Sequence, residues 1–392
     1  MSQQKSLEQM PVRCVLMRAG TSKGVFFHEA DVPPTGPARD RFLKRMMGTP
    51  DVMQIDGLGG SRLVTSKVAI IRRSTRPDAD VDYTFAQVDV DQDIVEHDYN
   101  CGNISSGVGP FAIDEGLVDA VEPVTTVRIC NTNTDKILVA KVPVRGGKAR
   151  VLGDFSIPGV PGSGAEILMD YAGTVGAKSG QLLPTGRAVD AIALEDGGSV
   201  AATLCDAANP CVFVHARDLG LSGSELPAEI MGNAGALARI FEIQAKAAHR
   251  LGFIDDWKST GNIGIPLFVM VAEPEAFVDM NGARHEAQDM DLRARLLFLG
   301  KCHESMAGTG SMCTAAASRV PGSVVSRVLM PEARATRSLR IGHPLGVMHL
   351  TVEAAAPSGA DAAPTFLALG FGRTARRLMD GVVYVPDPAF ES

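Results

Sequence analysis

The feature that most constrains this sequence is a short internal similarity. Residues 101–105 read CGNIS and residues 307–311 read AGTGS, and each segment opens a run of small apolar residues. Such runs predict two buried helices, one in each half of the chain, whose N-termini could face each other across a cleft. A similarity this short is common by chance, so its weight depends on the chemistry that it would bring together.

Strands separated by tight turns are expected along much of the remaining chain. The 41 glycines and 23 prolines, with only 5% aromatic residues, are typical of many turns between short strands. Residues 81–95 alternate apolar and polar side chains, which predicts a strand with one buried face. Residues 124–131 and 136–144 read as two strands joined by a hairpin, and residues 63–71 read as a β-branched strand.

Helical segments and a crossover between domains are also predicted. Apolar residues recur at helical spacing in residues 227–251, and further helices are expected near residues 39–47 and 292–299. Residues 151–190 are rich in Gly and Pro, which is typical of a connection between domains. A chain of 392 residues is long enough for two domains of about 150 residues each.

The composition narrows the classes of partner. A net charge of −7, with 45% hydrophobic and 21% charged residues, is ordinary for a soluble globular protein and excludes a mainly disordered chain. The sequence has no basic stripe with interleaved aromatic residues, so we expect no nucleic-acid partner. A mildly acidic protein that binds an anion must concentrate positive potential locally, because its overall field does not attract the ligand.

The cysteines and the N-terminal sequence bear on location. The seven cysteines are scattered, without a CxxC pair or a histidine at zinc spacing, as is typical of reduced thiols in a cytosol. The segment MSQQKSLEQM has no apolar signal region, and no apolar run reaches the ~18 residues of a membrane helix. We therefore expect a cytoplasmic protein without a membrane partner. No HxH, HExxH or carboxylate cluster supports a metal site.

Cys101 is the leading candidate for chemistry. If the Gly-rich segment after it starts a helix, the thiol lies at the positive end of the helix macrodipole, which stabilises a thiolate. The backbone amides of Gly102, Asn103 and Ile104 would then form a cradle for a carboxylate. A buried core cysteine is the alternative interpretation, and the spacing alone leaves the two balanced.

Lys67 interrupts the apolar and β-branched segment LVTSKVAII. A lysine in such a strand either points to solvent, which is the more common case, or is partly buried at a site. If it is buried, its pKa falls and the amine can act as a base near neutral pH. The sequence does not choose between these alternatives, and solvent exposure is the expectation.

Two further segments and two histidines are candidates for binding. The loop RAGTSKG at residues 18–24 offers amides, two hydroxyls and two cations for a carboxylate or phosphate, but it lacks P-loop spacing and is otherwise a polar turn. The segment DGLGG at residues 56–60 lacks the GxGxxG spacing, which excludes a nicotinamide site. His303 and His343 lie near Gly-rich turns and are expected to be structural or to position a substrate.

Several motifs together resemble one known family. In chain order they are MRAGTSKGVFF, QIDGLGG, TSKVAI, RPDADVDYTFAQV, NCGNISSGVGPFAIDEGLV, LPTG, RVPG, GHPLG and RTARRLMDG. They span residues 11–386 and resemble the 2-methylaconitate cis-trans isomerases and 4-oxalomesaconate tautomerases. This family is similar in fold to diaminopimelate epimerase. The resemblance implies a mixed α/β fold of two pseudo-symmetric halves, each a curled mixed β-sheet around a central helix.

The resemblance also implies the division of the chain and the roles of particular residues. Residues 1–185, completed by about 366–392, would form one half, and residues 186–365 the other. Diaminopimelate epimerase uses two cysteines as acid and base; the first corresponds to Cys101, whereas Ala307 occupies the second position. A two-thiol mechanism is therefore excluded, and Lys67 is implied as the catalytic partner of Cys101. Substrate binding is implied for Thr21, Ser22, Lys23, Ser66, Gly102, Asn103, Ile104, His303, Gly308, Thr309, Gly310, Ser311 and His343.

The implied activity is that of an isomerase that moves a proton on a small unsaturated di- or tricarboxylate, without a metal or organic cofactor, with a homodimer as one option for its assembly. Residues 76–88 and 100–118 resemble the oxalomesaconate branch most, which belongs to bacterial degradation of gallate, protocatechuate and lignin-derived aromatics. That branch includes keto–enol tautomerases and 1,3-allylic isomerases, which the sequence does not separate. The first alternative is 2-methylaconitate isomerisation in propionate breakdown. A carboxylate-binding protein without chemistry is the alternative from another class, because the second cysteine is missing.

Overall fold

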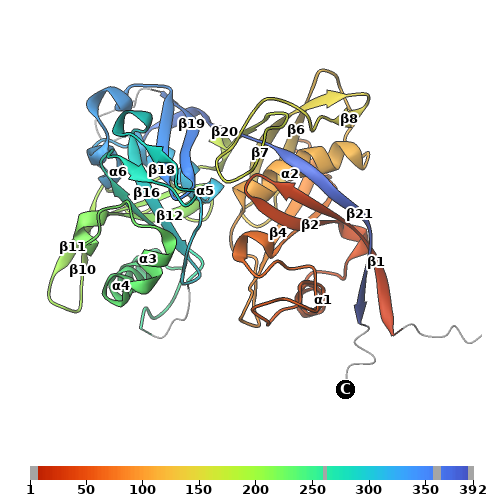
Figure 1. Ribbon diagram of the computed structural model, residues 1–392, viewed down its shortest axis with the longest axis horizontal. Helices are drawn as coiled ribbons and strands as arrows, with labels where there is room; N and C mark the ends of the chain where they lie inside the picture. Colours follow the sequence, from red (N-terminus) through yellow and green to blue (C-terminus); the bar gives the residue numbers. More distant parts are fainter. Residues whose placement is uncertain (1–7, 259–262, 356–362, 387–392) are drawn as a thin grey trace, which may run out of the picture.

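The computed structural model describes residues 8–258, 263–355 and 363–386. Figure 1 shows two lobes side by side, each built from strands that curl around one helix. The expectation of a cytoplasmic protein depends partly on the N-terminal segment, of which residues 1–7 lie outside the described residues. None of the helices in the described ranges is both long and apolar enough to cross a lipid bilayer.

The elements of the first lobe come from the first part of the chain and from its last strand. In chain order they are β1 (Gln9–Ala19), β2 (Ser22–His28), α1 (Pro37–Met47), the 3-10 helix η2 (Leu63–Thr65), β3 (Lys67–Arg73), β4 (Val81–Val88), β5 (Val95–Glu96), α2 (Gly102–Asp114), β6 (Val124–Asn131), β7 (Lys136–Arg145), β8 (Lys148–Ala149), β9 (Ile167–Asp170) and β21 (Ala375–Pro386).

The second lobe follows along the chain. Its elements are β10 (Asp190–Ala193), β11 (Ser199–Ala207), β12 (Asn209–His215), α3 (Pro227–Gly232), α4 (Ala234–Arg250), β13 (Leu267–Ala272), β14 (Phe277–Val278), β15 (Arg284–His285), β16 (Leu292–Phe298), β17 (Lys301–Cys302), α5 (Gly308–Ser318), α6 (Val324–Val328), β18 (Ser338–His343) and β19 (Gly346–Ala355). Strand β20 (Thr365–Arg373) pairs with β9 of the first lobe and β19 of the second, so it joins the two sheets.

The order of strand pairing repeats between the lobes. In the first, β1 is antiparallel to β2, β2 parallel to β3, β3 antiparallel to β4, and β4 parallel to β6. In the second, the same alternation runs through β11, β12, β13, β16 and β18. Helix α2 precedes β6 as α5 precedes β18. The predicted mixed α/β fold of two pseudo-symmetric halves is therefore confirmed, while the boundaries near residues 185 and 365 stay a prediction.

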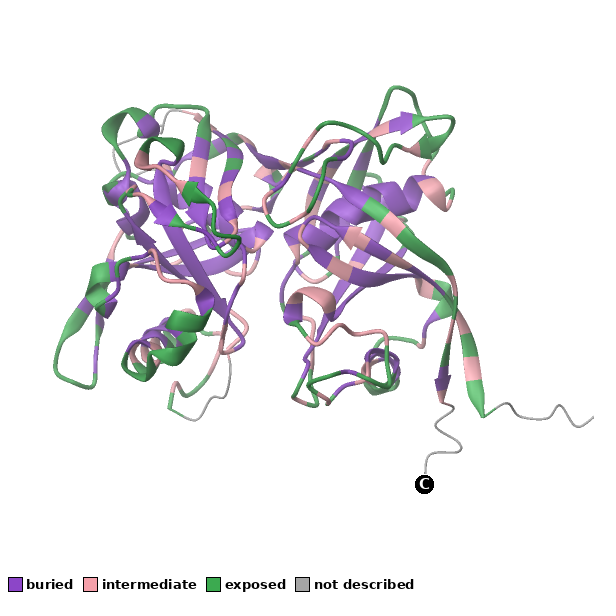
Figure 2. Cartoon of the chain, viewed as in Figure 1, coloured by how far each residue is buried: buried purple, intermediate pink, exposed green. Residues whose placement is uncertain are grey.

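Small residues allow α2 and α5 to lie inside the curled sheets. All residues of α5 and the first twelve of α2 are buried, and Figure 2 shows α2 buried over most of its length. A helix that is apolar or small on every side belongs in a core rather than on a surface. A β-carbon on Gly107 would lie 2.8 Å from the ring of Phe26 and 2.9 Å from the β-carbon of Ala19, so glycine is required for this close packing. The two helices predicted from the internal similarity are confirmed.

Three local predictions need correction. The helix expected near residues 292–299 is instead strand β16 (Leu292–Phe298), whose burial on both faces removed the period-2 signal. The strand expected from residue 63 begins only at Lys67, because Leu63–Thr65 forms a 3-10 helix. The helix expected over residues 227–251 is two helices, separated at Asn233, whose side chain caps α4 by accepting from the Ala236 amide.

Candidate active site

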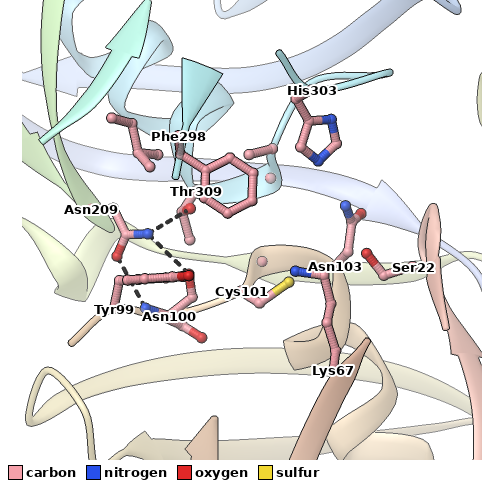
Figure 3. A pocket seen from close by; sticks show the side chains of 14 residues that line it. Ser22, Lys67, Tyr99, Asn100, Cys101, Asn103, Asn209, Phe298, His303 and Thr309 are labelled. Atoms are coloured by element: carbon pink, nitrogen blue, oxygen red, sulfur yellow. Dashed lines mark hydrogen bonds between the residues drawn. The ribbon is translucent and has the colours of Figure 1, made fainter. Parts of the chain in front are cut away.

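A cavity lies where the N-termini of α2 and α5 meet, at the junction of the two lobes. Figure 3 shows its lining, which includes most of the chemically interesting residues of both lobes. The lining residues are Ser22, Lys67, Tyr99, Asn100, Cys101, Gly102, Asn103, Asn209, Leu267, Phe298, His303, Ala307, Gly308 and Thr309.

The two helix ends supply amide donors to this cavity. The Ser105 amide bonds back to the Cys101 carbonyl and the Ser311 amide to the Ala307 carbonyl, so the three amides before each have no acceptor within their helix. These amides and the positive ends of two helix dipoles form a strong site for anions. Three of the predicted cradle residues are not among those that line the cavity: Ile104, Gly310 and Ser311.

Lys67 is buried at the start of β3, with only 4% of its surface exposed. The expectation of solvent exposure is therefore wrong. Its Nζ lies over the rings of Phe85 and Phe298, 5.2 and 5.9 Å from their centroids, and none of the described carboxylates pairs with it. Burial lowers the pKa of the amine, and the neighbouring Cys101 thiol, within hydrogen-bonding reach, partly opposes this shift. The shift is in the direction that a lysine needs in order to act as a base.

Cys101 is the residue immediately before α2, at the positive end of its dipole. It is a free thiol and lines the cavity, whereas the other six cysteines are buried elsewhere in the protein. Ala307 occupies the equivalent place before α5 and also lines the cavity. The second lobe therefore offers a methyl group where the first offers a thiol.

Gln87 on β4 was missed by the sequence reading. It lies opposite Lys67 in the β3–β4 pairing and is fully buried. Its Nε2 donates to the carbonyls of Leu63 and Ser66, at 3.1 and 2.9 Å, so its Oε1 must face the Lys67 amine, from which it accepts a hydrogen bond at 2.5 Å. Alternation along β4 places Gln87 on the same face as Val81, Tyr83 and Phe85, so a polar residue in the apolar register was the available signal.

His303 presents a hydrogen-bond donor to the cavity. The Ser305 amide donates to its Nδ1 at 3.0 Å, which leaves the proton on Nε2 when the ring is neutral. Burial is the main cause that lowers the pKa of His303 to about 4, so the ring is neutral at pH 7. Figure 3 shows the ring at the rim of the group that contains Cys101 and Lys67.

His343 lies apart from the cavity. Its Nδ1 accepts from the Leu345 amide at 3.2 Å, and its buried Nε2 has no hydrogen-bond partner among the described residues. Burial lowers its pKa to about 3, so it is also neutral. The resemblance predicts that His343 binds the substrate, but His343 is not among the residues that line the cavity.

The loop between β1 and β2 contributes one lining residue directly. The Ser22 hydroxyl is buried and has no partner among the described residues, which leaves it available to a ligand. Thr21 acts indirectly, since its hydroxyl accepts from Asn103 Nδ2 at 3.0 Å. Lys23 does not line the cavity, and its amine lies beside Gly60. Ser66 is also set back, because its hydroxyl accepts from Gln54.

Tyr99 and Asn209 are further lining residues that the sequence reading missed. Asn209 donates to the Asn100 carbonyl and to the Thr309 hydroxyl, both at 2.9 Å, and so connects the two lobes beside the helix ends. The Tyr99 hydroxyl is buried without a partner among the described residues. Asn209 begins β12 and Tyr99 lies in the connection between β5 and α2, and neither stands in a recognisable pattern of spacing.

The arrangement can hold a small anion between two helix ends and exchange protons with it through an amine and a thiol. Among the described residues, no group of three His, Cys, Asp or Glu side chains is placed to hold a metal ion. The fold and the site are those of a two-lobed α/β protein with a cavity between two helix N-termini. The chain belongs to the PrpF protein family, whose model matches residues 9–386.

Relatives with known names cover almost the whole chain. It is 47% identical to 3-methylitaconate isomerase of Eubacterium barkeri, over 96% of this chain and 98% of the relative. It is 36% identical to 2-methyl-aconitate isomerase of Shewanella oneidensis, over 97% and 98% of the two chains. It is 39% identical to (4E)-oxalomesaconate Delta-isomerase of a Novosphingobium species, over 95% and 97%. The predicted isomerase activity is confirmed, while the identities leave the substrate undecided.

Solved structures agree with this assignment. A crystal structure of methylitaconate-delta-isomerase superposes with a TM-score of 0.79 at 45% identity, covering 98% of this chain and 100% of the other. A hydroxyproline epimerase from Agrobacterium vitis, at 14% identity and a TM-score of 0.55, shares the fold over 97% of this chain and 94% of its own. The epimerase-like fold predicted from the sequence is confirmed.

Proposed function

We propose that the protein catalyses proton transfer within a small unsaturated di- or tricarboxylate, as a 1,3-allylic shift or a keto–enol tautomerisation, with Lys67 and Cys101 as the proton-transferring groups and no cofactor. One observation carries the proposal: a buried amine without a carboxylate partner lies within reach of a thiol, on one cavity between two helix N-termini. The amine and the thiol belong to different elements, so one can remove a proton and the other return it at a different carbon.

The chemistry follows from where charge develops. Removal of a proton from a carbon next to a carboxylate and a C=C bond gives a dienolate, whose negative charge spreads onto the carboxylate oxygens. Amides at the ends of α2 and α5 and the Nε2–H of His303 are fixed donors for those oxygens. Preorganised donors of this kind usually supply the largest part of the rate enhancement, because they need no reorganisation during reaction. The returned proton then completes a 1,3-allylic shift or, on oxygen, a tautomerisation.

Two compounds are the leading candidate substrates, and a third is an alternative. The relative at 47% identity is named for 3-methylitaconate, which supports an allylic shift on a branched dicarboxylate. The motifs at residues 76–88 and 100–118 favour 4-oxalomesaconate, which would place the enzyme in bacterial aromatic and lignin catabolism, and the relative at 39% identity carries that substrate in its name. 2-Methylaconitate, of propionate catabolism, is the third compound, from the relative at 36% identity.

The test is incubation of the protein in D₂O with each of the three compounds, followed by proton NMR and ultraviolet absorbance. We expect one compound to isomerise with deuterium incorporated at a carbon that gains a proton. Calorimetry with the same compounds distinguishes the alternative class. Tight binding of an unaltered compound, without deuterium incorporation from any of the three, would identify a carboxylate-binding protein and contradict the proposed function.

A further inference from the structure

Arg373, the last residue of β20, is a buried cation without a counter-charge. Only 3% of its surface is exposed, and no acidic side chain of the described residues pairs with it. Its hydrogen-bond acceptors are Asn103 Oδ1 at 3.1 Å, the Gly372 carbonyl at 2.9 Å and the Met348 sulfur at 3.3 Å. A guanidinium has five N–H donors, and sulfur is a weak acceptor. Burying such a charge without a carboxylate is costly, so its retention calls for a functional reason.

The guanidinium lies directly behind the junction of the two helix ends. It sits 3.9 Å from the centroid of the Phe371 ring, and that ring stacks on Tyr171. The Tyr171 hydroxyl donates to the Gly102 carbonyl at 3.1 Å. A β-carbon on Gly308 would lie 3.0 Å from the Phe371 ring. The two aromatic rings beneath the guanidinium therefore contact the first residue of each central helix.

Through Asn103, this charge reaches the cavity. Asn103 Oδ1 accepts from Arg373 and from the Thr21 amide, and one hydrogen of Nδ2 is donated to the Thr21 hydroxyl. Gly20 packs so tightly on this amide that a β-carbon there would lie 2.2 Å from Oδ1. The orientation of the amide is thus fixed, and its second Nδ2 hydrogen remains for the cavity. Figure 3 shows Asn103 beside Ser22, whose buried hydroxyl has no partner within the described ranges.

We propose that Arg373 is a positioning residue for one substrate carboxylate, which it attracts by its charge and orients by holding Asn103 toward a subsite formed with Ser22. The inference rests on the proposed function, because it takes a carboxylate as the ligand of the cavity. The inference extends the proposed function, because it assigns the placement of one end of the substrate to a residue of strand β20. Arg373 itself does not line the cavity, so it acts through Asn103.

Arg295 provides a matched control. It is equally buried, and burial lowers the pKa of both guanidinium groups to about 10. Arg295 donates to carbonyls of Ser224, Glu225, Ala294 and Gly342, none of which lines the cavity. Any general cost of removing a buried arginine should be the same for both, whereas an effect on a bound carboxylate should be specific to Arg373.

The experiment compares Arg373→Met, Arg373→Lys and Arg295→Met with the unaltered protein. Calorimetry measures the affinity for tricarballylate, a saturated tricarboxylate that has no C=C bond to shift, and kinetics measure kcat and KM on the turned-over substrate. We expect Arg373→Met to weaken tricarballylate binding and raise KM by about tenfold or more, with kcat within about threefold. Arg373→Lys, which keeps the charge, should recover part of the affinity. Arg295→Met should leave affinity and KM within about twofold.

Thermal unfolding without ligand separates positioning from structural support. Because an unpaired buried charge is removed, Arg373→Met should unfold at the same temperature as the unaltered protein or higher. Unchanged tricarballylate affinity in Arg373→Met, or a loss of affinity matched by Arg295→Met, would overturn the role of Arg373 and leave the proposed function intact. If the unaltered protein neither binds tricarballylate nor isomerises any of the three compounds, the proposed function itself fails, and this inference fails with it.

Discussion

Gly102 and Gly308, the first residues of α2 and α5, touch each other across the junction of the lobes. A β-carbon on Gly102 would lie 2.9 Å from the carbonyl carbon of Gly308, and one on Gly308 would lie 3.1 Å from the backbone of Gly102. The neighbour in each case is backbone, which cannot turn aside as a side chain can. This contact sets the distance between the two amide cradles, so it determines the size of substrate that both can hold at once.

Gly102→Ala should therefore push the helix ends apart by a few tenths of an ångström. We expect kcat/KM to fall by about 10²-fold, since small displacements of positioned groups have effects of that size. Gly232→Ala is the matched control, because a β-carbon at this helical glycine meets nothing within 4 Å. Steady-state kinetics of both variants check the prediction. Equal activity of Gly102→Ala and the unaltered protein would show that the contact does not define the site.

Lys67→Met should lower kcat/KM by about 10²–10⁴-fold, the range for loss of a general acid or base. The protein should stay folded, because the side chain is buried among aromatic rings and has no carboxylate partner in the described part of the chain. Lys178→Met is the control: this half-buried lysine bonds the Asn133 carbonyl at 2.9 Å and does not line the cavity. Deuterium incorporation and kcat/KM should be lost only in Lys67→Met; similar losses in both variants would contradict a catalytic role.

Cys101 should react with iodoacetamide before any other thiol, because the remaining six cysteines are buried. Labelling should inactivate the protein, and tricarballylate in the cavity should slow both processes. Peptide mass spectrometry identifies the modified residue. Cys101→Ala should resist inactivation by the reagent while having a lower initial activity. Inactivation that proceeds at the same rate in Cys101→Ala would show that the sensitive group is elsewhere.

Gln87→Met should move the acidic limb of the pH profile of kcat/KM to lower pH. The active base is the neutral amine of Lys67, whose pKa burial lowers, and the Gln87 oxygen favours its protonated form by accepting a hydrogen bond. Without that acceptor, the pKa falls further, and the amine stays neutral at lower pH. The other titratable groups at the cavity are Tyr99, Cys101 and His303, which the variant leaves unchanged.

Gln244→Met is the control for Gln87→Met. Gln244 is a buried glutamine on α4 that donates to the carbonyls of Ile263 and Pro266, so its loss also leaves buried carbonyls without a donor. Its pH profile should match that of the unaltered protein even if its unfolding temperature falls. A limb that moves equally in the two variants, or one that moves to higher pH in Gln87→Met, would contradict the role given to Gln87.

The amino-acid sequence by itself determined much of the local structure and two of the site residues. Small residues after Cys101 and Ala307 predicted both central helices, and these form because only side chains of that size fit inside curled sheets. The alternative readings of Lys67 were both visible in its strand. The hairpin between β6 and β7 followed from the turn residues between two alternating segments.

Tertiary structure alone decided which of those readings holds. Whether Lys67 is buried depends on Phe85, Gln87 and Phe298, which come from other strands, so its own neighbours in sequence carry no information about it. Strand β16 was misread because burial on both faces erases the period that distinguishes a strand. The roles inferred for Arg373 and Gln87 depend on their being buried polar groups with identified hydrogen-bond partners. Burial is a property of the packed molecule, and the protonation of an amine follows its burial.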